Sequence, residues 1–147
     1  MPHIIVLEDD EVLGERISRE LVSMGHEVRL TKSLLACLTA LNEEKFDLVI
    51  TEFFVRSERG VTHTSGATVT IAIRFSEIKK DGLNVDPKLP IIVLDGQAAD
   101  EEPLEFCEML GACATLRLPF VSEEFRKTVD AVLRPKRPAR ALRRSIA

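Results

Sequence analysis

The sequence predicts an α/β domain built on a doubly wound parallel sheet of five strands, with helices on both faces. Short apolar runs recur along the chain, and amphipathic segments of helical length separate them. Apolar runs with little polar alternation are typical of strands that are covered on both faces, as in parallel sheets. Regular alternation of strands and helices implies right-handed crossovers, which place helices on both sides of the sheet.

Five segments are expected to form the strands. Four of them are strongly apolar, and a weaker one, Glu27–Leu30, fits beside the first. Charged residues interrupt two of the apolar runs, at Asp47 and at Arg117. The apolar runs are Ile4–Leu7, Phe46–Ile50, Ile91–Leu94 and Ala114–Leu118.

Helices are expected between these strands, because apolar residues recur there at near-helical spacing. Gly25 is a natural terminator for the first helix, and Ser33 can cap the second. Gly111 closes the fourth helix, and Ser122 is expected to cap the last one.

The third helix is the one ambiguous element. β-branched residues between Thr68 and Ile73 favour a strand locally. The pattern continues through Ile78 with charged residues on the other side, and Gly82 can stop it. Because the alternation of elements requires a helix at this place, a helix from Thr68 to Ile78 is predicted.

Length and charge limit the organisation of the chain and its partners. The 147 residues suit one domain, assigned to residues 1–133, followed by a basic tail at residues 134–147. The formal net charge of −4 is uneven: the tail carries six cations and no acid, so the body carries about −10. An acidic body without Trp or Tyr lacks the broad basic face and the stacking aromatics of nucleic-acid-binding domains.

Neither export nor membrane insertion is indicated. Acidic residues follow the first apolar run directly, which does not fit a signal peptide, and no apolar run approaches the roughly 20 residues of a membrane span. Cys37, Cys107 and Cys113 have no metal-binding spacing and lie among apolar or small residues. They are expected to be reduced, mostly buried thiols, and the protein is expected in the cytoplasm.

Acidic residues follow three of the predicted strands. Glu8 and Asp9 come after the first strand, Glu52 after the third and Asp95 after the fourth. In parallel sheets the functional crevice lies beyond the carboxyl ends of the strands, so these carboxylates should converge. They could bind a hard divalent cation such as Mg²⁺, or repulsion could leave one of them protonated. A third interpretation is a set of scattered, solvated acids stabilised by the dipoles of the following helices.

Four segments carry a recognisable pattern: Ile4 to Asp10, Phe46 to Glu52, Leu89 to Gly96 and Gly111 to Phe120. Taken together, they resemble the receiver domains of bacterial two-component response regulators. In that family an acidic pair ends the first strand, a phosphate-accepting aspartate ends the third, Thr or Ser ends the fourth, and Lys-Pro-Phe ends the fifth. The resemblance covers about residues 3–133 and implies a flavodoxin-like fold with strand order 2-1-3-4-5.

Four positions depart from the family pattern. Glu52 occupies the place of the phosphate-accepting aspartate, and Leu118 that of the lysine whose ammonium pairs with the phosphoryl oxygens. Asp95 puts a negative charge in place of the switch hydroxyl, and Thr115 replaces the aromatic switch residue. Losing one buried charge-assisted contact costs roughly 1.5–3 kcal/mol, and a close like charge costs a similar amount. The resemblance therefore implies an atypical pseudo-receiver with disabled phosphate chemistry, and a cis peptide bond between Leu118 and Pro119.

The expected function is that of a stand-alone, phosphorylation-independent signalling module, not an enzyme, in a two-component-type pathway. The resemblance implies that it binds a signalling protein or a second copy of itself, through the fourth helix, fifth strand and fifth helix. This role is expected to require no cofactor. Whether Glu8, Asp9 and Glu52 bind Mg²⁺ stays open. It also stays open whether Glu52 imitates a phosphorylated acceptor or the site is simply retired.

Two other functions are alternatives. One is a Mg²⁺-dependent phosphoacceptor or phosphatase that uses Glu8, Asp9 and Glu52. The other is nucleic-acid binding through the basic tail, whose few cations have no aromatic anchors beside them. Residues 53–65 form a longer segment than receiver domains usually have at this place. The segment is expected to lie over the acidic residues and to be either functional or disordered.

Overall fold

The computed structural model describes residues 1–56, 62–78, 82–96 and 102–134 of the chain. Its five-stranded sheet is parallel throughout and has the order β2-β1-β3-β6-β7. When a small separate hairpin is left out of the count, this is the predicted order 2-1-3-4-5. The strands are β1 (His3–Leu7), β2 (Glu27–Thr31), β3 (Leu48–Glu52), β6 (Ile91–Asp95) and β7 (Ala114–Arg117).

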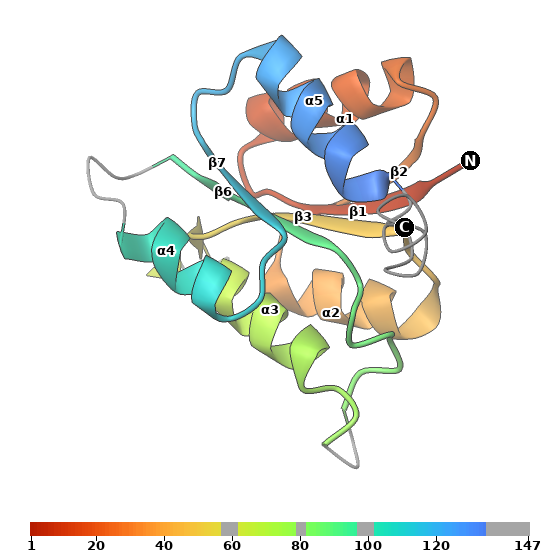
Figure 1. Ribbon diagram of the computed structural model, residues 1–147, viewed down its shortest axis with the longest axis vertical. Helices are drawn as coiled ribbons and strands as arrows, with labels where there is room; N and C mark the ends of the chain where they lie inside the picture. Colours follow the sequence, from red (N-terminus) through yellow and green to blue (C-terminus); the bar gives the residue numbers. More distant parts are fainter. Residues whose placement is uncertain (57–61, 79–81, 97–101, 135–147) are drawn as a thin grey trace, which may run out of the picture.

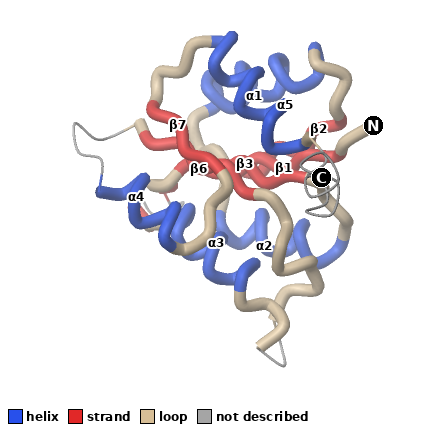
Figure 2. The backbone as a smooth tube through the Cα atoms, in the orientation of Figure 1, coloured by secondary structure: helices blue, strands red, loops and turns tan. Residues whose placement is uncertain are grey.

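Helices cover both faces of this sheet, as predicted (Figures 1 and 2). One face carries α1 (Glu11–Ser23) and α5 (Ser122–Leu133). The other face carries α2 (Leu34–Glu43), α3 (Ser65–Arg74) and α4 (Glu102–Met109). The doubly wound α/β fold is thus confirmed.

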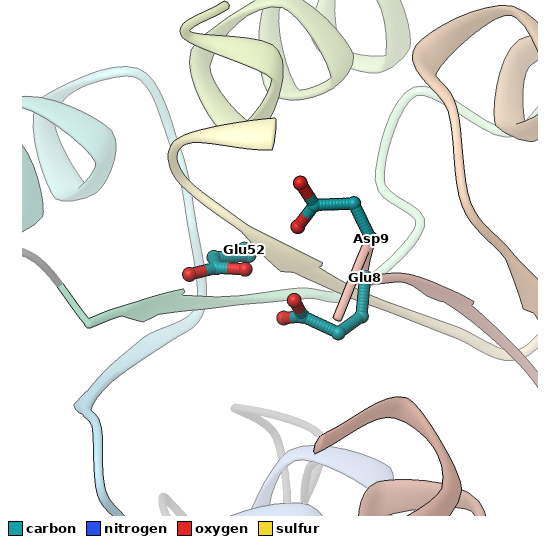
Figure 3. Close-up of side chains that lie close together, drawn as sticks. All are labelled: Glu8, Asp9 and Glu52. Carbon is teal, nitrogen blue, oxygen red and sulfur yellow. The ribbon is translucent and has the colours of Figure 1, made fainter. Parts of the chain in front are cut away.

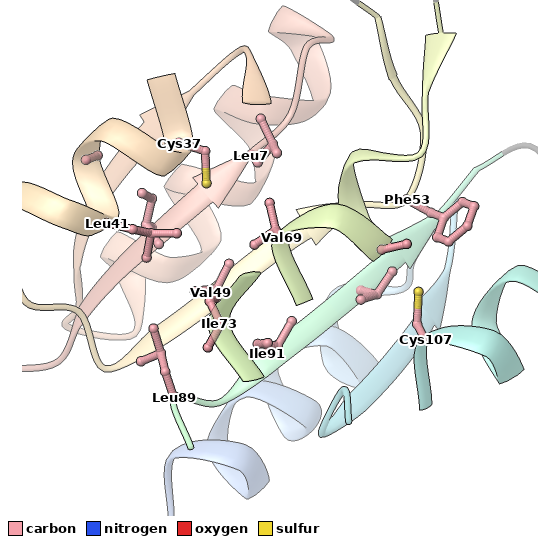
Figure 4. Packing of buried hydrophobic residues seen from close by; sticks show 14 residues of the cluster. Leu7, Cys37, Leu41, Val49, Phe53, Val69, Ile73, Leu89, Ile91 and Cys107 are labelled. Atoms are coloured by element: carbon pink, nitrogen blue, oxygen red, sulfur yellow. The ribbon is translucent and has the colours of Figure 1, made fainter. Parts of the chain in front are cut away.

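Each face of the sheet has its own apolar core, because neighbouring residues on a strand point to opposite faces. Ile5 and Leu7 belong to the core beneath α2, α3 and α4, which Figure 4 shows. Ile4 and Val6 belong to the core beneath α1 and α5. All four side chains are fully buried, which explains why the strand sequences are apolar without alternation.

The helix termini follow the predicted capping chemistry with one exception. The Ser33 hydroxyl accepts a hydrogen bond of 3.1 Å from the Ala36 N–H at the start of α2. Gly25, with a φ of +91°, lies just beyond the end of α1. The prediction that Ser122 caps α5 is wrong, because Val121 holds that position and Ser122 is the first helical residue. The Ser122 hydroxyl instead donates to the Glu20 carboxylate at 2.6 Å, which ties α5 to α1.

The ambiguous third helix is confirmed, although it is shorter at its end than predicted. Val69 and Ile73 are fully buried against the sheet, and this tertiary packing outweighs the local preference for a strand. The helix ends at Arg74 and does not continue to Ile78. The Arg74 guanidinium donates to the carbonyl oxygens of Pro87, Leu89 and Gly111, at 2.7 to 3.0 Å, which anchors this end to two neighbouring loops.

A short antiparallel hairpin follows β3, formed by β4 (Val55–Arg56) and β5 (Thr62–His63). Sequence reasoning missed it, because two-residue strands carry no readable apolar period. The middle of the long 53–65 segment lies outside the described residues, as does most of the basic tail, residues 135–147.

The three thiols do not share one environment. Cys37 and Cys107 are fully buried, as predicted, and burial raises the pKa of each thiol to about 11. Cys113, the residue before β7, is exposed, so the expectation of mostly buried thiols holds for Cys37 and Cys107 but not for this residue. The Leu118–Pro119 peptide bond is cis, as expected. Within the described ranges, no helix is long and apolar enough to cross a membrane.

Candidate functional site

Three carboxyl groups converge where β1 and β3 end. Leu7 of β1 is in register with Thr51 of β3, so the residues that follow them come close together. Glu8, Asp9 and Glu52 each offer an oxygen atom, and these atoms all lie within 4.8 Å of one another. Figure 3 shows the three side chains, which we call the acidic cluster. The structure thus brings together the residues that the sequence proposed as metal ligands.

Glu8 is the most buried member of the acidic cluster, with a relative exposure of only 1%. Its Oε1 atom accepts a hydrogen bond of 3.1 Å from the Asp10 N–H. Its Oε2 atom is buried and has no hydrogen-bond partner among the described residues. A buried carboxyl oxygen without a partner is costly and favours either a proton or a cation at this place.

Burial and like charge shift the protonation of the acidic cluster in one direction. Burial, reinforced by the neighbouring Glu52, raises the pKa of Glu8 to about 10. Burial is also the largest cause of the raised pKa of Glu52, and the charges of Asp9, Asp10 and Asp95 add to it. Of the three carboxyl groups, Glu8 is therefore the one whose protonated form the surroundings favour most.

The next acids along the chain do not join the acidic cluster as ligands. Asp10 is the N-cap of α1, where its carboxylate accepts from the Leu13 N–H at 2.9 Å. Glu11 forms an exposed ion pair of 2.8 Å with Lys32. Both serve the start of α1, as acids near helix N-termini commonly do.

Leu118 lies where the acidic cluster meets β6. A Cβ added at Gly96 would lie 3.2 Å from the Leu118 Cδ1 and 3.5 Å from the Glu52 Oε1. The Leu118 backbone N–H donates to the Asp95 carbonyl at 2.8 Å, which fixes this segment against the end of β6. A hydrocarbon side chain and a carboxylate thus border the same glycine.

Asp95 and Thr115 occupy the two remaining predicted positions. Asp95 is the last residue of β6 and has a relative exposure of 3%, so its carboxyl group is buried near the acidic cluster. The half-buried Thr115 on β7 donates from its hydroxyl to the Glu108 carboxylate of α4 at 3.0 Å. Arg117 is exposed, as the alternation of side chains on a strand predicts.

Glycine at position 66 also shapes the site, because it lets α3 begin directly against the end of β3. A Cβ at Gly66 would lie 2.8 Å from the Phe53 Cα and 3.1 Å from the Glu52 carbonyl oxygen. The Gly66 N–H donates to the Phe53 carbonyl at 3.0 Å. The backbone that carries Glu52 is therefore held by a contact that only a residue without a side chain permits.

Known proteins are similar to this chain, in sequence or in fold, over most of its length. The sequence is 26% identical over 137 residues to the transcriptional regulatory protein GlrR of Escherichia coli K12, covering 93% of this chain and 27% of GlrR. The receiver domain of HemR from Leptospira biflexa is 28% identical, with a TM-score of 0.66, over 94% of this chain and 98% of that one. The chain is receiver-like in fold and in sequence. No protein-family profile matches it.

A further receiver-like neighbour carries a metal. The receiver domain of the sensor histidine kinase PA1611 from Pseudomonas aeruginosa PAO1 is 21% identical, with a TM-score of 0.70, over 90% of this chain and 97% of that one. That structure holds a magnesium ion in its active-site cleft. The receiver-like domain described here spans only about a quarter of the length of GlrR, 27%.

Proposed function

We propose that this receiver-like domain is a signalling module that binds other proteins without first being phosphorylated. The observation that carries the proposal is the buried Glu8 carboxyl beside Glu52, with the hydrocarbon of Leu118 next to them. A phosphoryl group would bring more negative charge to a place where burial already favours a protonated carboxyl.

Two groups that would favour phosphate are replaced by groups that disfavour it. Leu118 supplies no ammonium, and losing such a charge-assisted contact costs roughly 1.5–3 kcal/mol, or about 10- to 100-fold in rate. Asp95 adds a buried negative charge, which already contributes to the raised pKa of Glu52. At about 6–8 Å and an effective dielectric of about 20, one like charge costs about 2–3 kcal/mol. Together the two changes are large enough to suppress phosphorylation by small donors.

The surface proposed for partner binding is formed by α4, β7 and α5. Large apolar side chains are exposed there: Phe106 is 47% exposed, Met109 is 84% exposed and Val121 is 65% exposed. Exposed apolar groups of this size are common at protein interfaces. The hydrogen bond from Thr115 to Glu108 connects β7 to α4. This bond links the two elements of the surface although Thr115 stands where receiver domains usually have an aromatic residue. A signalling protein or a second copy of the chain is the proposed occupant.

The decisive test uses acetyl phosphate with Mg²⁺ and the intact mass of the protein. The wild-type chain is expected to stay unmodified. The matched variant Glu52→Asp/Asp95→Thr/Leu118→Lys restores the acceptor, the hydroxyl and the ammonium, and it is expected to gain one phosphoryl group. Circular dichroism of both chains serves as the control for folding. A stoichiometric acyl phosphate on Glu52 of the wild-type chain would overturn the proposal.

A second candidate function, which the acidic cluster favours, is Mg²⁺ binding and phosphate chemistry that depends on it. Hard cations prefer carboxylate oxygens, and the unpartnered Oε2 atom of Glu8 offers a ligand to such an ion. A bound Mg²⁺ would neutralise charge between Glu8, Asp9 and Glu52 and polarise a phosphate oxygen. Turnover of a small phosphate ester with Mg²⁺, abolished by Asp9→Asn, would support an enzyme; we expect no turnover. Nucleic-acid binding by the basic tail stays an alternative, tested by the salt dependence of DNA binding.

A further inference from the structure

The opposite end of the sheet carries a second acidic region, with a different character. A groove of about 720 Å³ lies there, between the end of α2, the segment that leads into β3 and the loop that leads into β6. Five carboxylates and one ammonium line it, which gives a formal net charge of −4. The acids are Glu43, Glu44, Asp47, Glu77 and Asp86, and the cation is Lys45.

Most of this charge is not neutralised within the described residues. Glu44 forms an ion pair with Arg29. Among the described residues, neither Glu43 nor Glu77 forms an ion pair. Asp47 accepts a hydrogen bond of 2.8 Å from the His3 N–H, and Asp86 accepts one of 2.8 Å from the Lys88 N–H. A backbone N–H satisfies a carboxylate oxygen but leaves its charge in place. The groove is therefore suited to a cationic occupant.

The groove also offers apolar contacts. Leu41 is fully buried and Leu89 is 7% exposed, and both line the groove. The partly buried Phe46 and Val85 extend this apolar lining. An occupant that alternates cations with apolar side chains fits the groove better than a free metal ion or a purely basic peptide does.

The described chain ends beside this groove. Val132 and Leu133, at the end of α5, line a smaller hollow of about 380 Å³ together with Asp47. Asp47 also lines the acidic groove, so the two hollows share one wall. The end of α5 thus lies next to a surface that leads into the groove.

These following residues have the complementary chemistry. The segment 135–147 carries five cations and no acid, and Leu142 and Ile146 lie among them. Thirteen residues can span about 40 Å at about 3.3 Å each, more than the roughly 30 Å diameter of a small domain. The cations are Lys136, Arg137, Arg140, Arg143 and Arg144.

We propose that residues 135–147 dock in the acidic groove of the same chain. A short tether gives the segment an effective concentration on the order of millimolar at the groove, so weak individual ion pairs suffice for docking. Docking holds the cations of the segment against the domain and withholds them from nucleic acid and from other anions. The groove does not overlap the acidic cluster or the α4-β7-α5 surface, so this inference does not depend on the proposed function.

Paramagnetic relaxation enhancement in the full chain tests the docking. A nitroxide is attached at Ser145→Cys in a Cys113→Ser background, which leaves only the buried Cys37 and Cys107. At low salt the label is expected to broaden the amide signals of Asn84 and Glu77, at the groove, and to spare Gly96 near the acidic cluster. In about 1 M NaCl, where the Debye length is about 3 Å, the broadening is expected to disappear.

A matched pair of double variants separates specific docking from net charge. Glu43→Lys/Glu77→Lys reverses two exposed groove charges and is expected to abolish the broadening. Glu15→Lys/Glu124→Lys makes the same change in net charge on the exposed surface of α1 and α5, and it is expected to keep the broadening. Equal broadening in both variants, or no broadening in the wild-type sequence at low salt, would overturn the proposal.

A mixed sample identifies the source of the docked segment. Isotope-labelled chain without nitroxide is combined with unlabelled chain that carries it. The comparison sample contains one chain that carries both the isotope label and the nitroxide. Broadening in that sample, without broadening in the mixture, supports docking within one molecule. Broadening of Asn84 in the mixed sample would show exchange between copies and would overturn docking within the same chain.

Discussion

The two ends of the central sheet are both acidic, but they hold their charge in different ways. At the carboxyl end, Glu8 has a relative exposure of 1%. One of its carboxyl oxygens lies within 4.8 Å of a carboxyl oxygen of Asp9 and of Glu52. At the amino end, Glu43 and Glu77 are exposed to water at the rim of a groove. Water stabilises exposed carboxylates, whereas a buried one needs a proton or a cation. The comparison shows that burial, more than the number of acids, determines what each end can bind.

The largest expected effect comes from the backbone contact that holds the carboxyl end in place. Gly66→Ala pushes a Cβ to 2.8 Å from the Phe53 Cα, so α3 or the end of β3 must shift. We expect a loss of about 2–3 kcal/mol in the free energy of unfolding, measured by urea titration. The control is Gly25→Ala, which has open space but a φ of +91°. It should cost about 1 kcal/mol by backbone strain alone. A Gly66→Ala chain as stable as the wild type would refute the close packing.

Replacing Glu8 by a side chain that needs no proton in its buried position should stabilise the protein. The pKa of Glu8 is raised by burial and by Glu52, from 4.5 to about 10, so the folded state holds the proton more tightly than the unfolded state does. Stability from this group is complete below pH 4.5 and falls as the pH rises toward about 10. Glu8→Gln should therefore gain about 1–2 kcal/mol near neutral pH and nothing at acidic pH.

The amino end provides the control for this prediction. Glu77→Gln also replaces a carboxyl group by an amide, but at an exposed position. Its effect should stay within about 0.5 kcal/mol at every pH. Urea titrations at several pH values measure both variants. If the two variants have the same pH dependence, Glu8 is not the protonated group.

Mg²⁺ should stabilise the carboxyl end selectively. At ten times its dissociation constant a ligand adds about 1.4 kcal/mol, and binding here must release the Glu8 proton, so the gain should grow with pH. Thermal unfolding with and without MgCl₂ measures this gain, and Asp9→Asn should reduce it strongly. Ca²⁺ at equal concentration and ionic strength serves as the comparison. A gain of the same size in Asp9→Asn would place the ion elsewhere.

The smallest expected effect is at the rim of the groove. Reversing exposed charges in Glu43→Lys/Glu77→Lys should change the free energy of unfolding by less than about 1 kcal/mol, because charges at exposed positions contribute little to stability. The variant should nevertheless weaken the dependence of stability on salt, since it removes repulsion among the groove acids. A loss of several kcal/mol would mean that these acids have partners within the fold.

Part of the candidate site could be predicted because strand ends in a parallel sheet meet at one edge. Apolar periodicity located β1, β3 and β6 to within a few residues, and their register then brought Glu8, Asp9 and Glu52 together. The roles of single polar residues were less accessible. Ser122 has the sequence of a cap but bonds to Glu20, 102 positions away along the chain. Cys113 has apolar neighbours in sequence but lies exposed in space.

The sequence by itself determined the order of strands and helices, the acids at the strand ends and the absence of a lysine at Leu118. These features depend on local pattern and on residue identity, which a chain carries without folding. Only the tertiary structure decided that Glu8 is the most buried member of the acidic cluster, that Gly66 locks the end of β3, and that an acidic groove lies near the end of α5. Burial, clash distances and the meeting of remote segments arise from packing in three dimensions, and no local pattern encodes them.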